Sequence, residues 1–171
     1  MSSKIHRYPG TEVDLKDLEE GKILSSSYET VLKYAWTSGV AIGRFLEGLR
    51  EGEIWGRSCK VCGRVMVPPR MYCEEDFRET DEWVKLKDTG KVNTFSISYV
   101  NNDASRRKEP IVVSVVEIDG ASPGMGILHL LGDVEPSKVK IGMKVKAKWV
   151  PRSERKGAIT DIAYFRPRGK Q

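Results

Sequence analysis

Three cysteines and one aspartate are the residues in this sequence whose types and spacing suggest chemistry. Cys59, Cys62, Cys73 and Asp76 form the pattern C-x₂-C-x₁₀-C-x₂-D. Two thiolates on one tight turn reach the same ion at about 2.3 Å, and Gly63 relieves that turn. Asp76 stands where a second C-x₂-C pair would place its closing cysteine, and a carboxylate also completes a tetrahedral zinc site. The segment therefore predicts one structural zinc ion held by these four side chains.

Two other interpretations of the cysteine segment stay open. An odd number of cysteines with one C-x₂-C pair favours a metal site over disulfides in a reducing compartment. A redox pair is disfavoured because no strand–helix context of the thioredoxin type surrounds it. The remaining alternative is a degenerate ribbon that no longer holds metal and is stabilised by packing alone. Other donors are less well placed by sequence, namely Glu74, Glu75, His6, His129 and water.

The sequence offers little material for catalysis. It contains two histidines, His6 near the start and His129 within an apolar strand, where a core or interface histidine is expected. No Ser/His/Asp arrangement, phosphate-binding glycine loop or HExxH pattern is present. No catalytic residue is therefore assigned and the protein is predicted not to be an enzyme, with independent catalysis as the alternative.

Composition, charge and hydropathy limit the classes of protein to which this chain can belong. Hydrophobic residues make up 39% and charged residues 31% of the 171 residues, which is a globular composition. No apolar run approaches the ~18–20 residues of a membrane span. The N-terminus lacks the apolar stretch of a signal peptide, so a cytoplasmic location is expected. Residues 137–171 carry eleven basic and two acidic side chains, net +9, which indicates either an anionic partner or a solvated face.

The first part of the chain is expected to be helical and to need support. Residues 14–20 predict one short helical turn, and Ser26-x-x-Glu29 is a capping box that predicts a helix over about 27–36. A second helix follows Thr37-Ser38, with apolar residues on one face. These are Ile42, Phe45, Leu46 and Leu49. Because packing stabilises short helices, the helix over about 27–36 and the helix after Thr37-Ser38 must both lie on the rest of the chain or on another subunit.

From about residue 82 the sequence changes to short strands separated by turn signals. Five strands are expected, over residues 91–100, 111–118, 126–131, 145–150 and 159–165. No helical pattern separates them, so a small closed barrel is favoured over βαβ units.

The combined pattern resembles a family of zinc-ribbon/OB-fold proteins associated with thiolases and related acyl-CoA enzymes, formerly a domain of unknown function. The resemblance covers roughly residues 35–168. It rests on Cys59-x-x-Cys62-Gly63, Pro68-Pro69-Arg70, Cys73, Gly90-Lys91-Val92, the strand 112–118 with its Asp119-Gly120 turn, and Ile141-Gly142-x-x-Val145. The usual ribbon of this family carries four cysteines, so Asp76 is a departure.

The resemblance implies both a fold and a role. The expected fold class is mainly β with N-terminal helices, in which a rubredoxin-like zinc ribbon precedes a five-stranded OB-fold barrel. The expected boundaries are 1–54 for the arm and helices, 55–81 for the ribbon and 82–171 for the barrel. The implied role is a non-catalytic accessory subunit that binds a thiolase-like enzyme and helps to bind or channel its acyl-CoA substrate. The chain has no cysteine outside the ribbon to act as an acyl nucleophile, which agrees with that role.

Two surfaces are candidates for this role. Arg106, Arg107 and Lys108, in a polar loop expected over 101–109, are candidates to meet the phosphates of coenzyme A. The alternative for them is a solvated hairpin tip. The apolar helix face that begins at Ile42 is the candidate partner surface, and packing of that face on the barrel is the alternative.

Nucleic-acid binding is the competing function. OB-folds and zinc ribbons both occur in such proteins, and a net charge of +9 suits a phosphate backbone. Stacked bases would also need exposed aromatic platforms. The candidates are Phe95, Tyr99, Trp149, Tyr164 and Phe165, several of which fall at positions expected in the barrel core.

Overall fold

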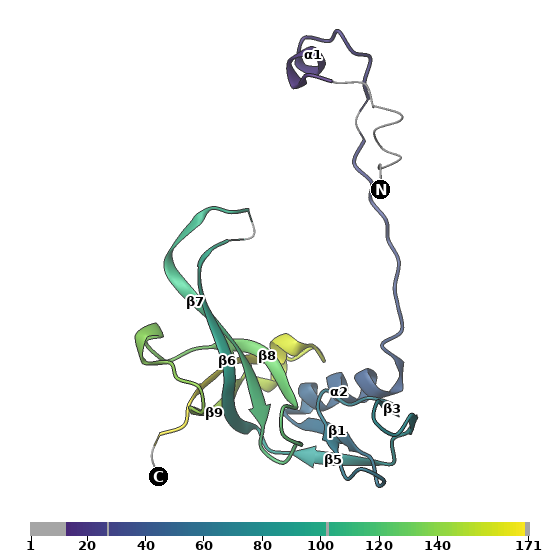
Figure 1. Ribbon diagram of the computed structural model, residues 1–171, viewed down its shortest axis with the longest axis vertical. Helices are drawn as coiled ribbons and strands as arrows, with labels where there is room; N and C mark the ends of the chain where they lie inside the picture. The colour runs from purple at the N-terminus through teal and green to yellow at the C-terminus, as the bar shows by residue number, and fades with distance from the viewer. Residues whose placement is uncertain (1–12, 27, 102, 170–171) are drawn as a thin grey trace, which may run out of the picture. The chain divides into compact units, whose positions relative to one another are not determined.

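The computed structural model describes residues 13–26, 28–101 and 103–169, in two units that meet between Trp36 and Thr37 (Figure 1). In the first unit, helix α1 spans Leu15–Glu19. The Asp14 carboxylate caps it by accepting a 3.0 Å hydrogen bond from the Lys16 backbone N–H. This confirms the short helical turn expected over residues 14–20.

The helix predicted over about 27–36 is wrong for the residues that the structure describes. Residues 28–36 form no helix, and residue 27 lies outside the described residues. The large apolar side chains of this stretch are exposed. A helix of about ten residues is marginal in water unless one face packs on something. The described contacts of the first unit supply no such surface.

Helix α2, Gly39–Glu51, forms as predicted and opens the second unit. Phe45 and Leu49 are buried in the core, and Leu46 packs against it. Gly52 ends the helix in the left-handed conformation, at φ 80°. The packing alternative is therefore correct for Phe45, Leu46 and Leu49, whereas Ile42 at the start of the face is 38% exposed. Most of the face is covered by barrel and ribbon side chains and is not free to serve as the partner surface.

The ribbon is built from five short strands. Strand β1 (Ile54–Ser58) pairs antiparallel with β2 (Val65–Met66) and with β5 (Glu82–Leu86). Strand β3 (Tyr72–Cys73) pairs with β4 (Arg78–Glu79). The buried Arg57 guanidinium joins the two pieces, because its Nε donates to Thr80 Oγ1 at 2.6 Å.

Five strands close the barrel in the order β10-β8-β7-β6-β9. They are β6 (Thr89–Val100), β7 (Arg106–Ile118), β8 (Gly126–Leu131), β9 (Lys144–Trp149) and β10 (Ile162–Pro167). All neighbours are antiparallel except β8 and β10, which are parallel. The predicted fold class is confirmed, with a rubredoxin-like ribbon followed by a five-stranded OB-fold barrel.

The hairpin of β6 and β7 is longer than predicted. Figure 1 shows its turn projecting beyond the other strands of the barrel. Residues 106–109 belong to β7 and not to the loop that was expected over 101–109. Their polar sequence hid this, because the apolar strand signal starts only at Ile111, where the hairpin joins the barrel wall. Cross-strand pairing extends the strand out to Arg106, opposite Val100.

One core runs through α2, the ribbon and the barrel. It includes Leu49 of α2, Ile54 of β1, Val116 of β7 and Phe165 of β10. No described helix is long and apolar enough to cross a membrane.

Candidate metal centre

The first half of the centre is a tight turn between β1 and β2. The Cys59 N–H donates to Arg64 O at 2.8 Å, and the Gly63 N–H donates to Cys59 O at 2.9 Å. Gly63 takes φ 73°, a conformation that glycine adopts without steric cost. These bonds fold Cys59 and Cys62 onto the same side of the turn.

The second half lies between β3 and β4 and has the same form with different residues. Cys73 opens it at the end of β3, and Asp76 stands three residues later. Phe77 follows at φ 49°, in the position that Gly63 holds in the first turn. A residue other than glycine in this conformation is uncommon.

The four predicted ligands come together. Their ligand atoms all lie within 4.8 Å of one another. Asp76 Oδ2 is 3.1 Å from Cys59 Sγ and 3.4 Å from Cys73 Sγ, and the Sγ atoms of Cys62 and Cys73 are 3.6 Å apart. A tetrahedral ion with bonds of about 2.3 Å needs edges of roughly 3.8 Å between sulfur ligands. Small movements therefore fit the set to zinc, and no disulfide joins the three cysteines.

The electrostatics of the cluster also favour a cation. Among the protein groups alone, the backbone of Arg64 has the largest effect on Cys62 and favours its thiolate. The Asp76 carboxylate, desolvation and the other two cysteines together outweigh it and raise the pKa of Cys62 to about 12. Hydrogen bonds from Cys59, and then from Cys62, lower the pKa of Asp76. A bound divalent cation reverses the first effect, because it stabilises thiolates directly.

The two acidic neighbours of Asp76 are directed elsewhere. Arg64 Nη1 lies 3.1 Å from a Glu74 oxygen and 2.8 Å from a Glu75 oxygen. Arg70 Nη1 lies 3.0 Å from the same Glu74 oxygen. These ion pairs account for the choice of Asp76, and not its neighbours, as the carboxylate of the cluster.

The centre is tied to the barrel by two kinds of contact. Ser122, in the β7–β8 connection, exchanges two 2.9 Å hydrogen bonds with Val65 of β2. Met125 packs against the buried cluster of Cys59, Met66 and Cys73 and also against the barrel core. The candidate metal centre is therefore fixed to the barrel at the β7–β8 connection.

The basic residues proposed for coenzyme A lie apart from the metal centre. Arg106, Arg107 and Lys108 are exposed at the start of β7. Arg107 is partly committed, because its Nη1 donates to Asn101 Oδ1 at 2.7 Å and its Nε donates to Glu109 O at 3.1 Å. Their role in ligand binding stays a prediction.

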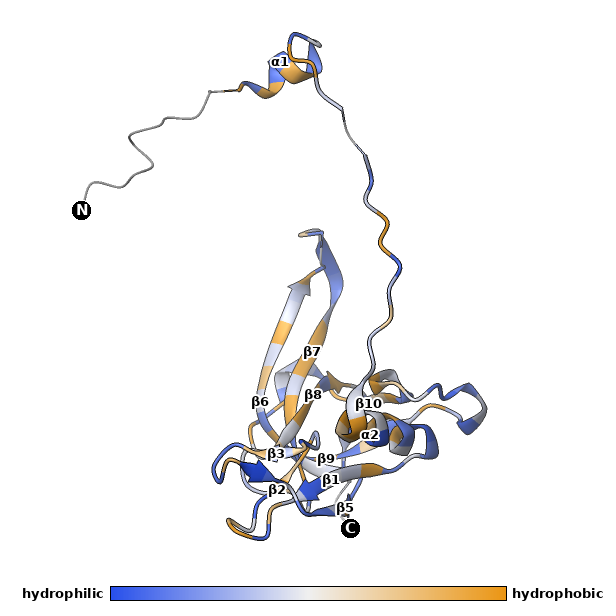
Figure 2. Cartoon of the chain, turned by 90° about the vertical axis from the view of Figure 1, so that its right-hand side faces the viewer, coloured by the Kyte–Doolittle hydropathy of each residue, from blue (hydrophilic) through white to orange (hydrophobic). Residues whose placement is uncertain are grey.

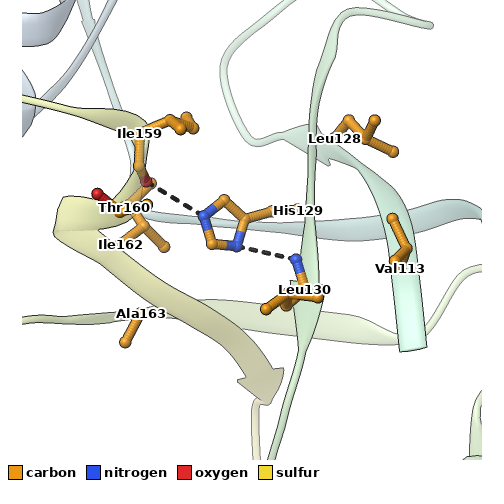
Figure 3. Close-up of a pocket in the computed structure, with 8 residues that line it drawn as sticks. All are labelled: Val113, Leu128, His129, Leu130, Ile159, Thr160, Ile162 and Ala163. Carbon is orange, nitrogen blue, oxygen red and sulfur yellow. Dashed lines mark hydrogen bonds between the residues drawn. The ribbon is translucent and has the colours of Figure 1, made fainter. Parts of the chain in front are cut away.

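Sequence reasoning missed an apolar groove on the outside of the barrel. It has a volume of about 350 Å³ and lies between β7, β8, the short 3₁₀ helix η4 (Ile159–Asp161) and β10 (Figure 3). Leu128 and Leu130 line it and are exposed, and Leu128 is 66% accessible. The run Gly126–Leu131 is apolar without alternation, so its sequence predicts a strand without distinguishing a covered face from an open one. A strand that is apolar on both faces also signals an uncovered surface.

His129 forms part of the groove wall (Figure 3). Its Nδ1 accepts a 2.9 Å hydrogen bond from the Leu130 N–H, so the ring proton lies on Nε2. Nε2 then donates to Ile159 O at 3.2 Å. Both ring nitrogens are occupied by backbone groups, as suits a structural histidine.

The aromatic residues considered for base stacking do not form an exposed platform. Phe165 is buried in the core, and Phe95 and Trp149 pack against that core. Trp149 also donates from Nε1 to Asp88 and has the Arg155 guanidinium over its ring. Tyr164 is held by Asp133 and Lys148. Of the five candidates, Tyr99 alone is classed as exposed.

Comparison with protein families and curated proteins gives a consistent result. A model described as the rubredoxin-like zinc ribbon domain of ChsH2 matches residues 46–82, and one for the C-terminal OB-fold domain of ChsH2 matches residues 83–150. A "DUF35 domain-containing scaffold protein" of Methanocaldococcus jannaschii is 33% identical over 115 residues, covering 66% of this chain and 79% of that protein. A scaffold protein of the same name from Methanothermobacter thermautotrophicus is 27% identical over 95 residues, covering 55% and 69%.

Two solved structures are similar in fold. A DUF35-family protein of unknown function from Sulfolobus solfataricus aligns with a TM-score of 0.55 at 30% identity, covering 64% of this chain and 78% of that one. A chain of the structure named "Ltp2-ChsH2(DUF35) aldolase" also gives a TM-score of 0.55, at 20% identity, covering 79% and 98%. The resemblance predicted from the cysteine and turn motifs is confirmed.

Proposed function

This chain belongs to the family of zinc-ribbon and OB-fold proteins described as DUF35 and ChsH2, and from this premise we propose that it is a non-catalytic accessory subunit of a thiolase-like acyl-CoA enzyme. In this role it helps to bind or channel the acyl-CoA substrate. The scaffold names of the archaeal relatives support an accessory role. Zinc is structural in this proposal, because Cys59, Cys62, Cys73 and Asp76 supply all four ligands and leave no open position for a substrate.

The observation that carries the proposal is the order of basic and apolar residues along β7. The strand begins with the basic run 106–108 and continues past a second hollow that Pro110 and Ile111 help to line. It then reaches Val113 in the apolar groove, and Leu130 lines both hollows. Side chains alternate between the two faces of a strand, so Arg107 is the basic residue on the same face as Val113, and at about 3.3 Å per residue the two are roughly 20 Å apart. Coenzyme A phosphates at the basic end and an acyl chain in the groove match this order.

The groove supports binding without catalysis. Its walls are aliphatic apart from His129 and Thr160, and His129 is committed to backbone groups through both ring nitrogens. Ligand pockets of this kind are typically a few hundred Å³ and mostly apolar, with few polar groups. A groove of about 350 Å³ belongs to that class. The reacting groups would then come from the partner enzyme.

Co-expression with a thiolase-like acyl-CoA enzyme from the same organism tests the partnership. We expect the two proteins to elute together and the purified enzyme to gain turnover on acyl-CoA when the chain is added. The accessory role fails if the chain elutes alone and the enzyme gains no activity.

A matched pair of variants tests the ligand line. Leu128 is 66% exposed in the groove, and Ile141 is 71% exposed outside it. Leu128→Asp should weaken acyl-CoA binding to the complex by roughly 10-fold or more, because a charge replaces apolar contact. Ile141→Asp should leave binding unchanged. Calorimetric titration with a long-chain acyl-CoA and with free coenzyme A measures both, and equal losses in the two variants would contradict the assignment.

A further inference from the structure

The segment between α1 and α2 exposes large apolar side chains that nothing in the described first unit covers. Tyr28 is 87% exposed, Leu32 is 73% exposed and Trp36 is 84% exposed, and Val31 and Tyr34 are also open. Figure 2 shows orange, hydrophobic stretches along the irregular chain that precedes α2. Such a concentration of exposed apolar groups marks an interaction site more often than a solvated linker.

The order of these residues is that of an amphipathic helix. Tyr28, Val31, Leu32 and Ala35 stand at i, i+3, i+4 and i+7, which places them on one helical face. On the opposite face, Glu29 and Lys33 have the i, i+4 spacing and orientation that stabilise a helix. Ser26 and Glu29 supply the capping box at its start. The sequence therefore encodes a helix of about three turns, which the described chain does not form.

The missing element is a surface to pack on. The contacts printed for these side chains amount to an edge-to-face pair of Tyr34 and Trp36, with ring centroids 5.9 Å apart. Helix α2 has a comparable pattern and folds, because Phe45 and Leu49 are buried in the core of its own unit. Disordered or irregular segments with such a pattern fold when a partner supplies the apolar surface.

We propose that residues 28–36 fold into an amphipathic helix in an apolar groove of the enzyme partner and so anchor the chain to it. The inference rests on the proposed function, since an accessory subunit needs a surface that holds the enzyme. Phe45, Leu46 and Leu49 of the α2 apolar face already pack in the core, and the barrel groove is assigned to the acyl chain. Described residues 13–36 carry five acidic and three basic side chains, so the groove on the partner is expected to have a basic border.

Adjacent positions on opposite helical faces give a matched test. Val31→Asp places a charge on the apolar face, and Thr30→Asp places the same charge on the polar face. We expect Val31→Asp to weaken binding of the full chain to the co-expressed thiolase-like enzyme by about 30-fold or more, and Thr30→Asp by less than about 3-fold. Both positions lie outside the core, so both variants should melt at the wild-type temperature.

A proline substitution separates a helix from extended docking. Lys33→Pro removes no apolar contact but breaks a helix in its interior, so affinity should fall by about 100-fold. Lys33→Ala, which keeps the helix, should change affinity by less than about 3-fold. Hydrogen exchange should be fast for the amides of residues 28–36 in the chain alone and slow in the complex.

The outcomes distinguish this inference from the proposed function. If the wild-type chain binds the enzyme while residues 28–36 stay unprotected and Val31→Asp binds normally, the inference is wrong and the accessory role stands. If the wild-type chain does not bind at all, both are wrong. If light scattering shows a dimer of this chain that Val31→Asp dissociates, the occupant is a second copy and the inference is overturned.

Discussion

The two turns of the metal centre reach one geometry with different residues. The first ends in Cys62 and Gly63, and the second ends in Asp76 and Phe77, yet the residue after each final ligand is left-handed in both. Glycine adopts this conformation without steric strain, whereas in other residues it costs on the order of 1–3 kcal/mol. Phe77 is 90% exposed and so gains little packing to offset that cost.

The difference shows which property of the ribbon is fixed. The second turn has the same ligand position and the same backbone conformation as the first, with different residue types. It carries a hard carboxylate where the first has the soft thiolate of Cys62, and an aromatic residue where the first has Gly63. The first turn is therefore expected to dominate metal affinity and folding, and the second to tune them.

Breaking the first turn should give the largest effect. Cys59 is buried and lies 3.1 Å from Asp76. Cys59→Ser removes a direct ligand, so zinc affinity should fall by more than the ~10–100-fold that results from losing an outer-sphere contact. The melting temperature should fall with it, because metal binding contributes folding free energy. Chelator competition and metal analysis measure this, with Val61→Ser in the same turn as the control. Full zinc content in Cys59→Ser would falsify the ligand set.

Changing the second turn should give a smaller effect of either sign. Asp76→Cys restores four thiolates and should raise zinc affinity, since thiolates suit zinc better than a carboxylate does. Asp76→Ala should lower it. Glu75→Ala is the control, because Glu75 pairs with Arg64 and not with the cluster. The same chelator assay reports all three, and an equal loss in Glu75→Ala would place the fourth ligand elsewhere.

Acidity should separate the two kinds of ligand. Thiols must lose protons to bind zinc, whereas the pKa of Asp76 is already lowered and its carboxylate is ionised at neutral pH. Zinc affinity should therefore fall as pH falls, because protons compete for the thiolates. Asp76→Cys should release about one more proton on binding, and its affinity should fall more steeply with decreasing pH. Calorimetry in buffers of different ionisation enthalpy counts these protons, and identical counts would contradict the assignment.

The smallest effects should come from the two left-handed residues. No atom lies within 4 Å of a Cβ placed on Gly63, so Gly63→Ala tests the conformation alone and should cost about 1 kcal/mol. Phe77→Gly relieves strain but adds entropy to the unfolded chain, so a gain below about 1 kcal/mol is expected. Urea denaturation of the zinc-loaded protein compares the pair. A loss in Phe77→Gly equal to that in Gly63→Ala would mean that Phe77 has a packing role.

The sequence predicted best where structure depends on local spacing. The cysteine pattern identified the four side chains that come together as a cluster able to hold a metal ion, because donors on tight turns are close in sequence. The barrel strands were recognisable from apolar runs and turn residues. Their limits were missed where apolar signal ends, as at Arg106, because cross-strand pairing extends a hairpin without any need for burial.

The sequence predicted least where structure depends on what a surface meets. Residues 28–36 and α2 both carry a helical apolar pattern, but only α2 packs on a core. In the same way, the apolar run 126–131 predicts a strand but does not show that Leu128 is exposed, because an apolar residue is compatible with a covered or an open face. Periodicity specifies a face but does not specify its neighbour.

Met125 has a consequence for how this protein could be altered or recombined. Its side chain is shared between the metal cluster and the barrel interior, and Ile54 and Val67 of the ribbon region lie in the barrel core. The ribbon is therefore not an independent domain that could be moved to another protein. Removing it, or transferring it to another barrel, would expose apolar core residues on both parts. Ribbon and barrel are therefore expected to be inherited and engineered together.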